Sequence, residues 1–139
     1  QATLGLSQLK RINKIVKMRH SVGKRYYKNL SKNSNIFIPE PKNNYAQNIY
    51  WVVGILIINK RLGLNALTTM KKLNKLGIGT RPFFWPMHKQ KILKKYRINT
   101  KKFDNSEYIS NYGFYLPTSL TLKNKEIDLI CRKVNKILS

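Results

Sequence analysis

Three aromatic residues, two prolines, an arginine and a histidine lie together in one short stretch, GIGTRPFFWPMHKQ, residues 77 to 90. The prolines stiffen the backbone, so a flat ligand that stacked on this segment would cost little conformational entropy. Arg81 carries a planar guanidinium that matches phosphate geometry, and His88 could donate a hydrogen bond to phosphate or sugar oxygens. The same residues also fit a core in which Phe83 and Phe84 are buried and His88 caps the next helix. Both interpretations stay open at this point.

Other side chains that could do chemistry are few and scattered. His20 lies among cations, and we expect this lone histidine to be structural or exposed. Cys131 lies beside an apolar stripe, and no nearby base or exposed setting indicates a reactive thiolate, so we expect it to be structural. The lysines fall on helix faces and in turns, none of them in an apolar setting that would favour a Schiff base. The glycines form no phosphate-binding loop. We expect the five acids to serve mainly at helix ends: Glu40, Asp104, Glu107, Glu126 and Asp128.

The charge balance is the strongest compositional feature. The 139 residues include 28 Lys and Arg but only five Asp and Glu, which gives a formal net charge of +23. Such a surface attracts nucleic acid, anionic lipid or phosphorylated ligands. The abundance of Lys, Asn and Ile together also fits a drift toward AT-rich codons, so the charge alone does not identify a partner.

Composition excludes several classes of protein. The 42% apolar content supports a real core and argues against overall disorder. A single cysteine allows neither an intrachain disulfide nor a multi-cysteine zinc site, and we expect no metal. The longest apolar run, residues 49 to 58, is too short to span a bilayer as a helix, and the sequence shows no signal-peptide pattern. We therefore expect a cytoplasmic protein without a membrane partner.

Hydrophobic periodicity predicts the elements that would position the aromatic stretch. An apolar stripe predicts one long helix over residues 4 to 30, and a polar connection runs from 31 to 48. The apolar, β-branched run IYWVVGILI, residues 49 to 57, predicts a strand in the centre of a sheet. The next helix, residues 65 to 76, has Asn65 as its expected N-cap and is followed by Gly77 in a left-handed conformation.

The second half predicts shorter elements. Pro82 forces an extended backbone over 78 to 84. After it we expect a weak helix, a second helix capped at Asp104 or Ser106, a short strand and a last helix that opens at Thr121; their ranges are 88 to 97, 103 to 112, 113 to 117 and 121 to 138. The order suits an α+β layer with a long connecting helix over 1 to 30, a connection over 31 to 44 and a small domain over 45 to 139.

Four blocks, in order, resemble the C-terminal region of the nucleotide-sugar aminotransferases of the DegT/StrS type, and within them the perosamine synthetases. The blocks are QATLGLSQLKRI, NIYWVVGILI, MKKLNKLGIGTRPFFWPMHKQ and YGFYLPTSLTLKNKEIDLICRKVNKIL. The resemblance runs over nearly the whole chain and is weakest at 31 to 44 and 97 to 106. Two departures from the family pattern are Lys91, where proline is frequent, and Met87, where leucine is usual.

This resemblance implies the small domain of a fold-type I aminotransferase, with a small antiparallel sheet flanked by helices. Such enzymes use pyridoxal phosphate (PLP) to transfer an amino group, usually from glutamate, to a nucleotide-linked keto sugar, here a GDP-linked 4-keto-6-deoxymannose. The resemblance places the Schiff-base lysine and most PLP contacts upstream of residue 1. The large PLP-binding domain would then be absent from this chain, which we expect to be inactive alone. The parent enzyme would be a homodimer with active sites at the subunit interface.

The family's aromatic loop matches Arg81, Phe83, Phe84 and His88, which the resemblance places at the nucleotide-sugar end of the site. Phe83 or Phe84 would contact the base or sugar, and Arg81 and His88 would lie near the diphosphate. Two alternatives remain: a stand-alone basic module that binds nucleic acid, although no known nucleic-acid motif is present, and a degenerate remnant that folds poorly.

Overall fold

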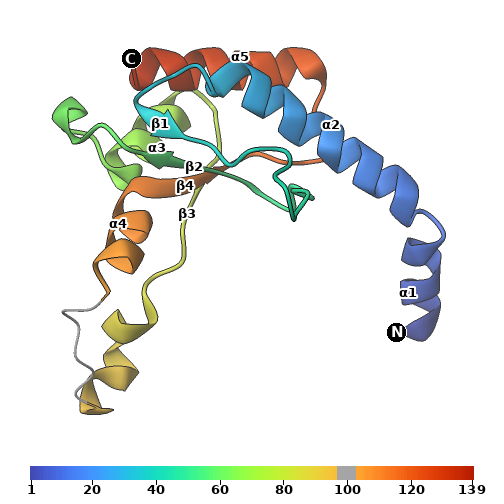
Figure 1. The fold of residues 1–139 in the computed structure, drawn as a ribbon, viewed down its shortest axis with the longest axis horizontal. Coiled ribbons are helices and arrows are strands. Elements are labelled where there is room, and N and C mark those ends of the chain that lie inside the picture. The colour runs from blue at the N-terminus through green and yellow to red at the C-terminus, as the bar shows by residue number, and fades with distance from the viewer. Residues whose placement is uncertain (97–102) are drawn as a thin grey trace.

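A four-stranded antiparallel sheet forms the centre of the molecule. The computed structural model describes residues 1–96 and 103–139 (Figure 1). In these two ranges the strand order is β1-β2-β4-β3. The strands are β1 (Ile36–Phe37), β2 (Val53–Ile57), β3 (Arg81–Pro82) and β4 (Gly113–Leu116).

Helices surround this sheet. The α-helices of the described ranges are α1 (Ala2–Leu9), α2 (Ile12–Leu30), α3 (Ala66–Lys75), α4 (Asp104–Tyr112) and α5 (Asn124–Ile137). The 3-10 helices of the same ranges are η1 (Lys60–Leu62), η2 (Met87–Lys89) and η3 (Lys91–Tyr96). Figure 1 shows α2 and α5 lying together along one side of the sheet, whereas α1 projects away at the far end of α2. The predicted α+β class and the small antiparallel sheet flanked by helices are confirmed. In the described ranges no helix has the length and apolarity needed to cross a bilayer.

The core lies between the sheet and helices α2, α3 and α5. Alternate side chains of β2 point into it, and these residues, Val53, Ile55 and Ile57, are almost fully buried. The central position of β2, between β1 and β4, is the one that its apolar sequence predicts. The helices contribute the remaining large side chains, among them Tyr26, Leu30, Leu73, Ile127, Val134 and Leu138.

Helix α3 begins and ends at residues whose types favour helix ends. The side chain of Asn65 accepts a hydrogen bond from the Thr68 backbone N–H at 2.9 Å, and the Thr68 hydroxyl accepts one from the Asn65 N–H at 3.0 Å. This reciprocal capping box satisfies two backbone donors that would otherwise lack partners. At the other end Gly77 has a φ of 76°, which is the left-handed conformation that glycine adopts at low cost. The N-cap at Asn65 and the left-handed Gly77 were both predicted, whereas the reciprocal bond from Thr68 was not.

The predicted N-terminal helix is interrupted. α1 ends at Leu9, and Arg11 leaves the helical conformation with φ −108° and ψ 1° before α2 begins. None of the residues of α1 is buried. Helices in proteins depend mainly on the packing of one face, and no buried contact within residues 1–96 and 103–139 holds α1 in line with α2.

Several predicted boundaries are wrong. β2 begins at Val53 rather than residue 49, because the left-handed backbone of Tyr50, with a φ of 53°, interrupts the extended conformation before Val53. α4 starts after Phe103 with no side-chain cap, so neither Asp104 nor Ser106 caps it. α5 begins at Asn124 rather than Thr121, since the Glu126 carboxylate accepts the Lys123 backbone N–H there at 2.6 Å.

The short helix expected over 88 to 97 forms as the 3-10 helices η2 and η3. Residue 97, its predicted end, lies outside the described residues. The strand expected over 113 to 117 is present as β4.

Candidate functional site: a pocket at the edge of the sheet

Strand pairing brings distant parts of the sequence together at one end of the sheet. Arg81 of β3 pairs with Tyr115 of β4, and Tyr115 in turn lies opposite Gly54 of β2. One pair further along, Val53 lies opposite Leu116. The segments that enter β2 and leave β4 therefore meet beside Arg81.

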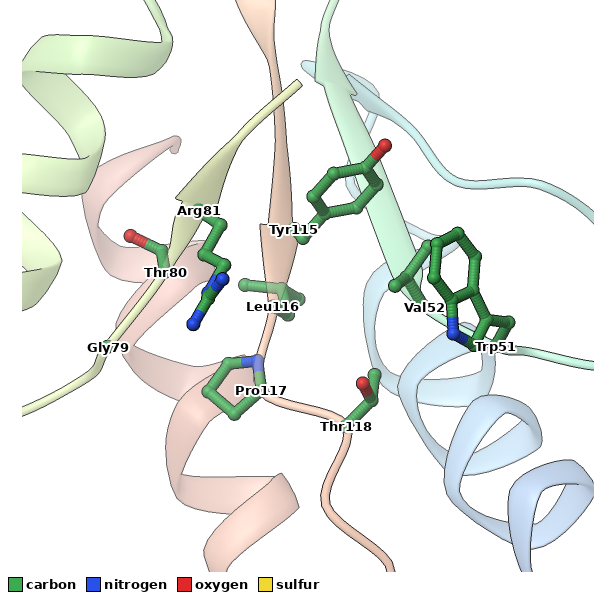
Figure 2. A pocket seen from close by; sticks show the side chains of 9 residues that line it. All are labelled: Trp51, Val52, Gly79, Thr80, Arg81, Tyr115, Leu116, Pro117 and Thr118. Atoms are coloured by element: carbon green, nitrogen blue, oxygen red, sulfur yellow. The ribbon is translucent and has the colours of Figure 1, made fainter. Parts of the chain in front are cut away.

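These segments enclose a pocket of about 550 Å³ that opens to solvent. This volume lies within the range of small-molecule sites. Figure 2 shows Arg81 and Thr80 on one side of it, Trp51 on the other, and Leu116 with Tyr115 between them. The lining residues are Trp51, Val52, Gly79, Thr80, Arg81, Tyr115, Leu116, Pro117 and Thr118.

Arg81 makes this pocket electropositive, because it is the one charged residue in the described lining. The ion pairs of residues 1–96 and 103–139 involve Arg25, His88 and Lys89 but not Arg81. A guanidinium without a carboxylate partner can bind an anion in a bidentate manner. The side of the pocket formed by Arg81 therefore suits a phosphate group, and Thr80 and Thr118 add hydroxyl-bearing residues to the lining.

Trp51 gives the opposite side a different chemistry. Its side chain remains 66% exposed although indole is a large apolar group. Exposed aromatic faces stack well on bases and sugars. The pocket therefore combines a cationic side with a flat aromatic side, and the ligand that fits both has an anionic group attached to a planar or apolar one.

Phe83, the first aromatic residue of the predicted loop, packs on the sheet. Its ring centroid lies 4.6 Å from that of Tyr115, and its ring covers two glycines. A Cβ added at Gly54 would lie 2.8 Å from Phe83 Cζ, and one added at Gly113 would overlap the ring. Phe83 thus supports Tyr115, a lining residue, and does not itself line the pocket.

Phe84 behaves differently from its neighbour. Its side chain is 77% exposed, and its closest described aromatic contact is an edge-on arrangement with Tyr115 at 6.4 Å between centroids. The following residues Trp85 and Met87 are also exposed. The interpretation that both Phe83 and Phe84 belong to the core is therefore wrong, since Phe84 is free to contact another molecule.

His88 lies in a separate cluster between η2 and α4. Its side chain is only 5% exposed, and its Nε2 is hydrogen bonded to Oε1 of Glu107 at 3.0 Å. Lys89 Nζ donates to the other carboxylate oxygen at 2.6 Å, and the His88 ring stacks on Phe103. Hydrogen bonds from Lys89 and then His88 lower the pKa of the Glu107 carboxyl. Of the four predicted site residues, Arg81 lines the pocket and His88 does not.

The acids divide between two roles. Glu126 serves the start of α5, as expected. Asp128 instead accepts hydrogen bonds from Arg25 and Asn29 of α2, and the Arg25 hydrogen bonds are the main reason that its pKa is lowered. Cys131, on the same helix, is buried, and burial raises the pKa of its thiol to about 12. A thiol that resists ionisation is a poor nucleophile, which agrees with the predicted structural role.

Among the lysines whose side chains the structure describes, none is suited to hold PLP. A Schiff-base lysine is activated by desolvation or by a neighbouring cation in an enclosed site. Every lysine whose side chain the structure describes is exposed or half-buried, and none lines the pocket. The residues of the pocket therefore fit the phosphate end of a ligand but not a covalently bound cofactor.

Sequence reasoning missed Trp51, Tyr115 and Thr118. These residues lie far from Arg81 in the sequence and approach it only through the pairing of β2, β4 and β3. Their local patterns belong to strand ends and carry no ligand signal. The available hint was Tyr115, an aromatic residue close to the proline that follows β4. That hint does not show which strands pair with β4.

Comparison with known proteins identifies the family to which this geometry corresponds. Residues 1–135 match the family model of the DegT/DnrJ/EryC1/StrS aminotransferases. The GDP-perosamine synthase of Caulobacter vibrioides is 29% identical over 99% of this chain and 36% of that enzyme. The chain thus spans little more than a third of the curated relatives that it matches.

Solved structures share the fold. The Helicobacter pylori aminotransferase PseC, which takes part in pseudaminic acid biosynthesis, superposes with a TM-score of 0.84 at 20% identity, over 97% of this chain and 36% of that one. The Escherichia coli GDP-4-keto-6-deoxy-D-mannose-3-dehydratase with bound hydrated PLP gives 0.76 at 17% identity, over 97% and 33%. The alternative of a stand-alone nucleic-acid-binding module finds no support in these comparisons.

Proposed function

Because the chain belongs to the DegT/DnrJ/EryC1/StrS aminotransferase family, we propose that it is the C-terminal portion of a PLP-dependent sugar aminotransferase. The parent enzyme would transfer an amino group from glutamate to a nucleotide-linked 4-keto-6-deoxy sugar, as a GDP-perosamine synthase does. The observation that carries this proposal is the pocket in which Arg81, unpaired among the described residues, faces Trp51. A nucleotide sugar has the diphosphate and the flat base that these two sides suit.

In this proposal Arg81 binds the diphosphate through charge-assisted hydrogen bonds. Phe84, exposed two residues after β3, contacts the base, the sugar or the neighbouring subunit. Phe83 acts from behind by supporting Tyr115. A direct contact between His88 and the diphosphate would require His88 to leave Glu107, so we assign His88 to holding the loop against α4.

PLP would be held by the part of the parent enzyme that this chain does not include. The described lysines are too exposed for a Schiff base, so the described residues would contribute walls of the substrate site and no covalent chemistry. We propose that the chain alone is inactive and that the parent is a cytoplasmic homodimer that serves polysaccharide biosynthesis. The exposed leucines of α1, Leu4, Leu6 and Leu9, would pack on the PLP-binding domain.

A chimera tests this function. The 139 residues would replace the matching residues of the Caulobacter vibrioides GDP-perosamine synthase, and 2-oxoglutarate would be measured after addition of glutamate and GDP-4-keto-6-deoxymannose. We expect turnover, and we expect Arg81→Ala to lower kcat/KM about tenfold or more, the usual effect of losing hydrogen bonds to a charged group.

Two controls make the outcome interpretable. PLP absorbance and the elution volume report whether the chimera is folded and loaded. Arg61→Ala, at an exposed arginine of η1 outside the pocket, should leave kcat/KM unchanged. A folded, PLP-loaded chimera that forms no 2-oxoglutarate would contradict the proposal.

A further inference from the structure

The segment that carries Trp51 has an unusual backbone. Tyr50 is the one non-glycine residue of the described ranges with a positive φ, at 53°. This left-handed conformation is unfavourable for a bulky side chain and persists only where the surroundings impose it. The distortion lies directly before Trp51, which forms the aromatic side of the pocket.

Helix α2 holds the Tyr50 side chain in place. The ring is buried and lies so close to Gly23 that a Cβ at position 23 would overlap it. Burial raises the pKa of the Tyr50 phenol to about 12. The phenol oxygen has no hydrogen-bond partner among the described residues, so packing against the glycine, and not a polar contact, fixes the ring.

Hydrogen bonds hold the backbone of the same residues. The Tyr50 N–H donates to the Asn48 side chain at 2.8 Å. From α2, Nη1 of Arg19 donates to the Tyr50 carbonyl at 3.3 Å and to the Trp51 carbonyl at 3.0 Å. A guanidinium nitrogen carries two N–H groups, which allows one nitrogen to bind two successive carbonyls. Arg19 is therefore the side chain that connects α2 directly to the backbone of Trp51.

We propose that Arg19 is a positioning residue that fixes Trp51 as a stacking wall of the pocket. With its carbonyl held, Trp51 keeps its indole across the pocket from Arg81 (Figure 2). Arg81 would bind the phosphates of the ligand and Trp51 the flat group attached to them. The identity of the ligand rests on the proposed function, whereas the restraint of Trp51 by Arg19 does not.

Fluorescence of the 139-residue chain tests the restraint without any ligand. The chain has two tryptophans, so Trp85→Phe, a change outside the pocket, leaves Trp51 as the reporter. In this background we expect Arg19→Ala to lower the anisotropy of Trp51 and to increase its quenching by acrylamide. Arg19→Lys keeps one charged donor and should restore part of the anisotropy.

Arg25→Ala is the matched control, since Arg25 lies on the same helix but bonds to Asp128. It removes an arginine of α2 without touching the Trp51 backbone, so Trp51 anisotropy should stay at the parent value. Unchanged anisotropy in Arg19→Ala, or an equal fall in Arg25→Ala, would overturn the proposal. Circular dichroism of each variant confirms that the comparison is made between folded chains.

Titration with GDP and with inorganic diphosphate then tests the consequence for binding. Loss of a stacking contact weakens binding by about tenfold, so Arg19→Ala should raise the Kd of GDP about tenfold and leave that of diphosphate unchanged. An equal effect on both probes would contradict the stacking role. If the parent chain binds neither probe, the proposed role of this pocket in nucleotide binding fails, while the anisotropy result still decides whether Arg19 restrains Trp51.

Discussion

Two arginines in different regions of the molecule show how the same side chain serves structure in one place and is available for a ligand in another. Arg25, between α2 and α5, donates from Nε and Nη2 to the two carboxylate oxygens of Asp128 at 2.8 and 2.5 Å. Arg81, at the edge of the sheet, faces a pocket whose described lining contains no acid. The first holds two helices together, and the second leaves its hydrogen-bonding capacity unused within the described chain.

The difference gives a way to interpret the net charge of +23. With only five acids, most cations have no carboxylate partner, so an unpaired lysine on a helix face carries little information. Asp128 and Glu107 are both committed to cations that connect separate elements. An unpaired arginine becomes informative where it also lies in a concave site opposite an aromatic residue, and Arg81 meets that condition.

The largest expected effect falls on the helix region and leaves the pocket unchanged. Leu30 of α2 is fully buried, and removal of a buried leucine side chain costs about 2–5 kcal/mol. Leu30→Ala should lower the free energy of unfolding by that amount in urea denaturation, with GDP affinity unchanged at temperatures where the chain is folded. Leu67→Ala, at an exposed leucine of α3, is the control. A similar loss in both variants would mean that the core is not packed as described.

Arg81→Ala should have the converse effect. Hydrogen bonds to a charged group contribute about 1.5–3 kcal/mol, so the Kd of inorganic diphosphate should rise about tenfold or more. The unfolding midpoint should not change, since Arg81 makes no ion pair among the described residues. Calorimetric titration beside denaturation measures both quantities. A fall in stability without a change in affinity would assign Arg81 to structure.

Phe83 and Phe84 are adjacent residues that differ in the same way as the two arginines: Phe83 packs on the sheet, and Phe84 is available for a ligand. Phe83 is half-buried over two glycines, so Phe83→Ala should destabilise the chain by about 1–2 kcal/mol. Phe84 is exposed, and Phe84→Ala should change stability by less than about 0.5 kcal/mol but raise the substrate KM of the chimera. Thermal denaturation and steady-state kinetics separate the two, and an unchanged KM would remove Phe84 from the site.

The smallest expected effect is on the stability of the chain at acidic pH. The Asp128 pKa is lowered from its ordinary value of 3.8, first by the Arg25 hydrogen bonds. The ionised carboxylate therefore contributes stability above that value, and the contribution is lost as pH falls below it. Between pH 5 and pH 3 (roughly one unit either side of the ordinary value), Asp128→Asn should show a shallower fall of the urea midpoint than the parent chain. Asp104→Asn, at an exposed acid, should follow the parent curve.

The fold was predictable to the extent that local patterns determine it. The central strand, the N-cap at Asn65 and the left-handed Gly77 follow from residue types at neighbouring positions. The break after α1 and the left-handed backbone at Tyr50 could not be predicted in this way, because each depends on what packs against the segment. α1 has no buried residue, and Tyr50 is held by Gly23 and Arg19 of α2.

The site was half predictable for the same reason. Arg81 could be identified from its aromatic and proline neighbours in sequence. Trp51, Tyr115 and the support of Trp51 by Arg19 come from three other segments, and only the order of the strands makes them neighbours of Arg81. His88, whose sequence setting matches that of Arg81, is turned instead toward Glu107.

The most direct test of the central claim is a residue-resolved titration. The ¹⁵N-labelled chain would be titrated with GDP-mannose, a stable nucleotide sugar, and followed by amide and indole chemical shifts. The account predicts shifts at the indole of Trp51 and at the amides of Thr80, Arg81, Tyr115 and Thr118, with Arg25, Asp128 and the other residues of the α2–α5 contact unchanged. Shifts confined to the α2–α5 contact, or no shifts at the pocket, would contradict the claim that this edge of the sheet binds a nucleotide sugar.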